Sequence, residues 1–132
     1  MSSYYLAARY SRREELQGYR AELERLGHKV YGRWLTGAHL ATEEDILRRP
    51  ELGRDFAVDD LLDICQADTM IAFTELPRSA ANRGGRHVEF GIAIAQEMAL
   101  VVVGPRENVF HCLPDVKVYA TWAEFLAEVA RG

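Results

Sequence analysis

Residues 83–103 have the sequence RGGRHVEFGIAIAQEMALVVV, in which a glycine turn is followed by an apolar helix and then by an apolar strand. Apolar side chains recur at helical spacing over residues 87–98, and residues 99–103 form a continuous apolar run of strand length. Gly104 and Pro105 follow at once and should end the strand. A helix that leads directly into an apolar strand is typical of a parallel sheet with helical connections.

The same alternation extends through the rest of the chain. The pattern predicts further strands over residues 4–8, 28–34, 69–74 and 116–119. Ser11 and Glu14 have the spacing of a capping box for a helix that should end near Gly27, and Thr121 should cap a last helix through Val129. We therefore predict one α/β domain over residues 1–132, with a doubly wound, five-stranded, mostly parallel sheet of Rossmann or flavodoxin type and helices on both faces.

The middle of the chain has a less regular pattern. Residues 36–53 are polar and mixed, which predicts a loop with a short helix from about Thr42 and an interruption at Pro50. An i, i+3, i+4, i+7 apolar stripe, predicted to be the buried side of a helix, consists of Val58, Leu61, Leu62 and Cys65. Asp60 lies roughly opposite this stripe, so helical periodicity alone predicts that it is solvated.

Ligands of such sheets bind at the carboxyl ends of the strands. The loops over residues 9–13, 75–85 and 105–111 should therefore meet. They bring two arginines, Arg9 and Arg86, and the small or polar residues Ser11, Gly84, Gly85 and His87 to one edge. Glycine backbone and a helix N-terminus suit a phosphate, and arginine binds phosphate bidentately. The alternative is that these arginines are solvated or pair with Glu14, Glu75 or Glu107.

Glu89 stands at the start of the apolar helix, directly after this predicted anion-binding loop. A first-turn glutamate often does no more than complement the helix dipole. The nearby glycines and arginines favour a more specific role, because they should keep the carboxylate ionised and fixed, as a glycosidic nucleophile requires. Tyr5, within the first strand, has the position of an ordinary core tyrosine.

The composition is that of a globular protein. The net charge of −4 gives no indication of nucleic-acid binding. Cys65 and Cys112 have apolar neighbours and lack metal-ligand spacing, which predicts buried free thiols in a reducing compartment. No histidine spacing indicates zinc, and no motif indicates an organic cofactor, so we expect neither. No apolar run is long enough to span a bilayer, and we expect a cytoplasmic protein with no membrane partner.

Four segments together resemble the nucleoside 2-deoxyribosyltransferase family, including its branch of 2′-deoxynucleoside 5′-phosphate N-hydrolases. They are residues 4–9 (YYLAAR), 60–64 (DLLDI), 67–72 (ADTMIA) and 85–93 (GRHVEFGIA). The last is the most specific, since the family pattern there is a small-residue loop, a glutamate, an apolar residue and glycine. Residues 104–111 (GPRENVFH) are similar to phage and actinobacterial members.

The resemblance implies retaining glycosyl transfer without a cofactor. Glu89 matches the family's nucleophile, Tyr5 the tyrosine that orients it, and Asp60 the catalytic aspartate, eight positions before Asp68. The motif thus contradicts the solvated position that periodicity predicts for Asp60, and we follow the motif. Family sites are completed by a neighbouring subunit, which implies a homodimer or larger homo-oligomer with Asn108 and His111 as candidate contributions from the partner.

Two departures concern the predicted phosphate site. Ala8 and Arg9 replace a Gly-Ser pair of the hydrolase branch, and His87 replaces a small residue. Both changes add polar or positive character. The leading hypothesis is cleavage or transfer at the N-glycosidic bond of a (2′-deoxy)nucleoside or its 5′-monophosphate through a glycosyl-glutamate intermediate. The alternatives are a nucleotide-binding or sensing module without turnover and a ribonucleotide N-glycosidase.

Overall fold

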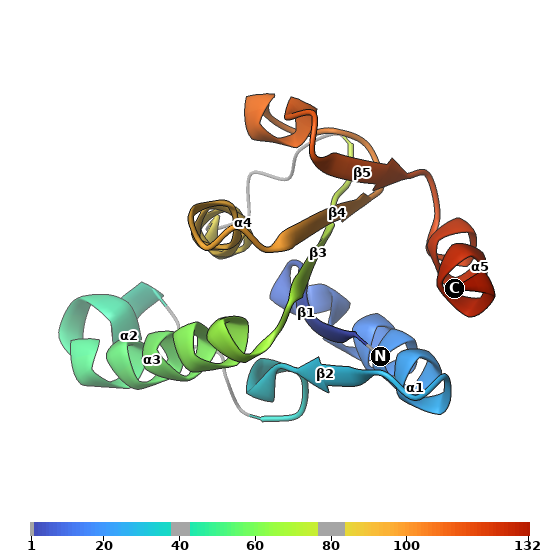
Figure 1. Cartoon of the computed structure of the whole chain (residues 1–132). Coiled ribbons are helices and arrows are strands. Elements are labelled where there is room, and N and C mark those ends of the chain that lie inside the picture. The colour runs from blue at the N-terminus through green and yellow to red at the C-terminus, as the bar shows by residue number, and fades with distance from the viewer. Residues whose placement is uncertain (1, 38–42, 77–83) are drawn as a thin grey trace.

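The computed structural model describes residues 2–37, 43–76 and 84–132, which form a five-stranded sheet covered by helices (Figure 1). The strands are β1 (Ser3–Ala7), β2 (Lys29–Tyr31), β3 (Thr69–Phe73), β4 (Ala99–Val103) and β5 (Val116–Tyr119). All four neighbouring pairs are parallel, in the order β2-β1-β3-β4-β5. The predicted fold class is therefore confirmed, and the sheet is parallel throughout.

The helices cover both faces of this sheet. Helices α1 (Arg13–Arg25) and α5 (Trp122–Arg131) lie on one side, whereas α2 (Glu43–Arg48), α3 (Pro50–Gln66) and α4 (Gly85–Ala95) lie on the other (Figure 1). Because both faces are covered, the central strands are apolar in unbroken runs. All five residues of β3 are buried, as are the last four residues of β1 and of β4.

The ends of the elements differ in how well the sequence predicts them. Gly27, with φ of +91°, follows α1 and donates its N–H to Glu24, and Thr121 caps α5 by accepting from the Glu124 N–H at 3.2 Å. Both predictions are confirmed. The capping box of Ser11 is wrong, because a 3-10 turn, η1 (Tyr10–Arg12), precedes α1 and no side chain caps that helix.

The second strand is shorter than predicted, because a further 3-10 turn, η2 (Arg33–Leu35), follows it. Two long-range hydrogen bonds fix this turn. Trp34 Nε1 donates to the carbonyl of Leu6 at 3.0 Å, and the Arg33 backbone N–H donates to Asp63 Oδ2 at 2.9 Å. These contacts with β1 and α3 outweigh the local preference of the sequence for an extended strand.

The apolar stripe of α3 faces outward, contrary to the prediction. Val58, Leu61 and Leu62 are exposed, and the residues that α3 buries are Asp63 and Ile64. Asp63 can be buried because Arg33 pairs with it at 3.1 Å. Cys65 and Cys112 are exposed as well, so the prediction of buried thiols is also wrong. The short helix predicted from about Thr42 is α2, and Pro50 interrupts the helical segment as predicted, because α2 ends at Arg48 and Pro50 starts α3, in agreement with its preference for the first helical turn.

Two glycines have conformations that other residues rarely adopt. Gly84 precedes α4 with φ of +83°. Gly104 follows β4 with φ of +121°, and a Cβ atom there would lie 2.7 Å from the carbonyl oxygen of Thr74. Thr42 itself and most of the predicted polar loop over residues 77–85 lie outside the described residues. In the parts of the chain that are described, no helix is long and apolar enough to cross a membrane.

Candidate active site

Glu89 and Tyr5 meet between α4 and the sheet. The Tyr5 hydroxyl donates to Glu89 Oε2 at 2.5 Å, across 84 residues of sequence. Tyr5 is fully buried in β1, while Glu89 is only partly exposed in the first turns of α4. A phenol fixed in this way can hold the carboxyl group in one orientation, as the family resemblance implies.

Asp60 of α3 belongs to the same cluster. Asp60 is half-buried, and its Oδ1 atom is shielded from solvent. Its negative charge raises the pKa of both Glu89 and Tyr5. The helical periodicity of α3 predicted a solvated side chain. That prediction is wrong because the outward face of α3 is the apolar stripe, so the residue opposite the stripe turns toward the sheet. The structure thus brings together the three residues that the motif singles out.

The protonation of Glu89 differs from the prediction. Its pKa is raised to about 8, mainly by burial and further by the negative charge of Asp60, while the hydrogen bond from Tyr5 opposes this shift. Among the described residues, no arginine contributes to this shift, because Arg9 and Arg86 pair with Glu75 and Glu107. Burial also raises the pKa of Tyr5 well above its ordinary value, so the phenol remains a hydrogen-bond donor.

Arg86 is engaged with Glu107 in a closed ion pair. Its Nη1 and Nη2 atoms donate to the two carboxylate oxygens at 2.6 and 2.8 Å, and the two side chains are 3% and 0% exposed. Burial alone would raise the pKa of Glu107, but hydrogen bonds from Arg86 and from the backbone N–H of Glu75 lower it below its ordinary value. Arg86 therefore pairs with Glu107, which was the alternative to its predicted contact with a phosphate.

Arg9 pairs with Glu75, which the alternative reading also included. Arg9 Nη1 lies 2.5 Å from Glu75 Oε1, and Arg12 Nη1 lies 3.8 Å from Glu75 Oε2. In contrast to the pair of Arg86, these side chains are partly open to solvent. Ser11 is exposed on η1, and Gly84 and Gly85 lie at the start of α4.

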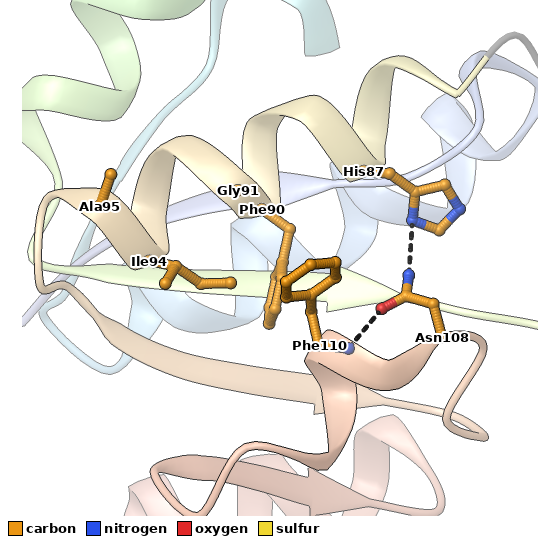
Figure 2. A pocket seen from close by; sticks show the side chains of 7 residues that line it. All are labelled: His87, Phe90, Gly91, Ile94, Ala95, Asn108 and Phe110. Atoms are coloured by element: carbon orange, nitrogen blue, oxygen red, sulfur yellow. Dashed lines mark hydrogen bonds between the residues drawn. The ribbon is translucent and has the colours of Figure 1, made fainter.

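His87, Asn108 and His111 lie on the side of α4 away from Glu89. The 3-10 turn η3 (Val109–Cys112) packs there, and Asn108 Nδ2 lies 3.3 Å from His87 Nδ1 (Figure 2). His111 is 1% exposed, accepts the Glu107 N–H at its Nδ1 atom, and meets the ring of Phe90 edge-on. Of the two residues predicted to contribute to a partner's site, Asn108 is partly exposed, whereas His111 is buried within its own subunit.

A cavity of about 460 Å³ separates α4 from η3 (Figure 2). Its walls are mostly apolar, with one polar end, and are formed by His87, Phe90, Gly91, Ile94, Ala95, Asn108 and Phe110. Glu89 does not line it, because residues 87, 90, 91, 94 and 95 share the opposite face of the helix. Within the described ranges there is no cluster of three side chains suited to a metal ion.

The sequence indicated Glu107 only as a candidate partner of an arginine, but in the structure it connects the segment after β3, the start of α4 and the turn η3. Its carboxylate accepts from Arg86 and from the Glu75 N–H, and its own N–H donates to His111. A glutamate in a polar loop after a strand carries no local signal of burial. The neighbouring Gly104 and Pro105 indicated only that β4 ends there.

The comparison with solved structures finds the same fold. The CMP N-glycosidase BcmB of Clostridium botulinum superposes with a TM-score of 0.64 at 19% sequence identity, over 98% of this chain and 99% of that chain. At this identity the likeness shows the fold alone. No protein-family model and no curated protein sequence matches the chain.

Proposed function

We propose that the protein cleaves the N-glycosidic bond of a nucleoside or nucleoside 5′-monophosphate, with Glu89 as the attacking group. The observation that carries the proposal is the enclosed cluster of Glu89, Tyr5 and Asp60 beside the carboxyl ends of the strands. A retaining glycosidase uses two carboxyl groups close to the bond that is cleaved. The fold shared with a CMP N-glycosidase supports the same reaction class.

In the first step a Glu89 oxygen attacks C1′, the bond from C1′ to the base nitrogen breaks, and Asp60 gives its proton to the base. Water then attacks C1′, the ester bond to Glu89 breaks, and the water proton passes to Asp60. A second base in place of water would give transfer. Tyr5 donates to Glu89 and so holds the attacking oxygen in position.

The reaction needs one proton on the carboxyl pair, and it needs that proton on Asp60. In the free protein burial favours the proton on Glu89. Entry of the substrate would bring the developing positive charge of the sugar next to Glu89, which favours its ionised form. The resting pair thus has the correct number of protons but not the reactive arrangement.

We further propose that Arg9 contacts a 5′-phosphate. It follows β1 at the sheet edge where ligands of this fold bind, and it is only partly buried. Arg86 has a different role, because both its terminal nitrogens are committed to Glu107 in the interior. It fixes the loop after β4 to the start of α4, the helix that carries Glu89.

We also propose that the protein forms a homodimer. The outward faces of α3 and α4 and the turn η3 expose six large apolar side chains, namely Val58, Leu61, Leu62, Val88, Val109 and Phe110. Monomers rarely expose so much apolar surface on one side, so a second copy would cover it. Asn108, beside Phe110, is then the residue placed to reach the partner's site.

Free base released from a panel of ribo- and deoxyribonucleosides and their 5′-monophosphates tests the proposal. We expect release from at least one 5′-monophosphate by the wild-type protein and none from Glu89→Gln. Absence of release across the panel, with binding retained, would instead support a nucleotide-binding module. The raised pKa of Glu89 favours that second candidate, since a protonated carboxyl can bind but not attack.

A further inference from the structure

Arg9 and Arg12 share one carboxylate at the edge of the sheet. Strands β1 and β3 are paired neighbours, with Ala7 opposite Ala72, so the residues that follow them lie side by side. Glu75 Oε1 is 2.5 Å from Arg9 Nη1, and Glu75 Oε2 is 3.8 Å from Arg12 Nη1. Each oxygen of the carboxylate thus faces a different guanidinium, as two oxygens of a phosphate group would.

The two Arg–Glu pairs at this edge differ in access. Arg86 and Glu107 are closed off, whereas Arg9, Arg12 and Glu75 have side-chain exposures of 29%, 22% and 27%. An anion from solution can therefore compete with Glu75, but it cannot compete with Glu107 without opening the interior.

The charges around Arg12 are balanced in the free protein. Arg12 also donates to both oxygens of Glu15, at 2.9 and 2.7 Å. Among the described residues, these two arginines and two glutamates carry no net positive charge to attract a phosphate. Displacement of Glu75 leaves both arginines with one carboxylate between them, and an incoming phosphate restores the balance.

We propose that Glu75 is a specificity-determining residue, an internal anion that a substrate phosphate displaces from Arg9 and Arg12. This rests on the proposed function, in which Arg9 contacts the 5′-phosphate. An anion with no further contacts then has to break the existing ion pair and binds weakly. A nucleotide gains additional contacts through its sugar and base. The ion-paired group of Arg9, Arg12 and Glu75, which we call the clamp, therefore favours a nucleotide over free phosphate.

Glu75→Gln tests the proposal. The variant should keep the fold, because the hydrogen bond from the backbone N–H of residue 75 to Glu107 does not depend on the side chain that is changed. We expect inorganic phosphate and CMP to bind about tenfold more tightly to the variant, which is the size of one charge-assisted contact, as measured by calorimetry. Cytidine, which lacks the phosphate, should bind equally to both proteins.

Glu14→Gln is the matched control, since Glu14 is exposed in the first turn of α1 and the substitution makes the same change in net charge. We expect no change in phosphate affinity for this variant. Arg9→Ala should weaken phosphate binding more in the Glu75→Gln background than in the wild type. Unchanged or weaker phosphate binding by Glu75→Gln, or an equal gain in Glu14→Gln, overturns the proposal.

Binding of inorganic phosphate requires no turnover, which separates this proposal from the proposed reaction. Tighter phosphate binding by Glu75→Gln without base release from any nucleotide would support the clamp and contradict the glycosidase. Base release together with unchanged phosphate affinity would support the glycosidase and contradict the clamp.

Discussion

The carboxyl of Glu89 is largely protonated at neutral pH, because burial raises its pKa to about 8. A glycosyl nucleophile reacts as the carboxylate. Loss of that proton above a pH of about 8 leaves the Glu89–Asp60 pair without the one proton that the reaction needs for the leaving base. We therefore expect kcat/KM for base release to decrease as the pH increases through about 8, since this ratio reports the free enzyme. Initial rates at low substrate concentration across this range measure the profile. A ratio that continues to increase above a pH of about 8 would contradict a reaction that uses one proton on this carboxyl pair.

Tyr5 and Asp60 act on Glu89 with opposite signs. The hydrogen bond from Tyr5 favours the ionised form, and the charge of Asp60 disfavours it. Tyr5→Phe should shift the pH profile to higher pH, and Asp60→Asn should shift it to lower pH. Asp60→Asn should also slow substrates with poor leaving bases most, because these need protonation. Two shifts in the same direction would show that the residues do not act through Glu89.

Glu89 also links stability to pH. Its pKa of about 8 in the folded protein lies above the ordinary value of 4.5, so the folded state holds the proton more tightly than the unfolded state. The stabilisation is fully present below the ordinary value and is lost as the pH increases through about 8. We expect the free energy of unfolding of the wild type to decrease over this interval relative to that of Glu89→Gln. Urea titrations of both proteins at several pH values measure the difference, and parallel curves would contradict it.

At the scale of elements, the pair of Arg86 and Glu107 joins the start of α4 to the loop after β4. Glu107→Gln leaves the guanidinium buried without a carboxylate. Loss of one partner of a buried ion pair typically costs about 3–5 kcal/mol, so we expect a decrease of that size in the free energy of unfolding. Combining this substitution with Arg86→Met removes both charges and should recover most of the loss. Urea denaturation of the single and double variants checks this, and a double variant less stable than Glu107→Gln would contradict it.

The sequence predicts those elements whose signals are local. The apolar run over residues 99–103 becomes β4, and Gly27 and Thr121 end and begin helices as predicted. Local sequence signals fail where tertiary contacts determine the end of an element or the face that it buries. Trp34 bonds to Leu6 and ends β2 early, and the stripe containing Leu61 faces solvent because a buried Asp63 is paired on the other side of α3.

The candidate site shows the same division. Glu89 is recognisable from its glycine-flanked motif, but its contact with Tyr5 spans 84 residues and no local pattern indicates it. Here the family resemblance supplied what periodicity could not. The expectation that arginines keep Glu89 ionised fails because a sequence does not show which carboxylate each arginine meets. Arg9 and Arg86 meet Glu75 and Glu107 instead.

At the scale of the whole molecule, the two helical layers differ. The layer of α1 and α5 lies on one face of the sheet (Figure 1). Its side chains Leu16, Leu23 and Phe125 are buried. The layer of α3 and α4 also exposes large apolar side chains, among them Leu62 at 51% and Val88 at 65%. An isologous dimer would bury this second layer and place Asn108 of each copy near the other.

Leu62→Glu should therefore disrupt self-association. A carboxylate on both copies at a two-fold interface brings like charges together in an apolar surrounding, which disfavours association strongly. We expect the wild type to sediment as a dimer and Leu62→Glu as a monomer with an unchanged circular dichroism spectrum, because this side chain is already exposed in the single chain. Leu26→Glu is the matched control, since Leu26 is exposed at the end of α1 on the opposite layer and should leave the dimer intact. If base release depends on a residue from the partner, Leu62→Glu should lose it while Leu26→Glu retains it. A monomeric wild type, or a dimer that Leu62→Glu leaves intact, would show that this layer is not the interface.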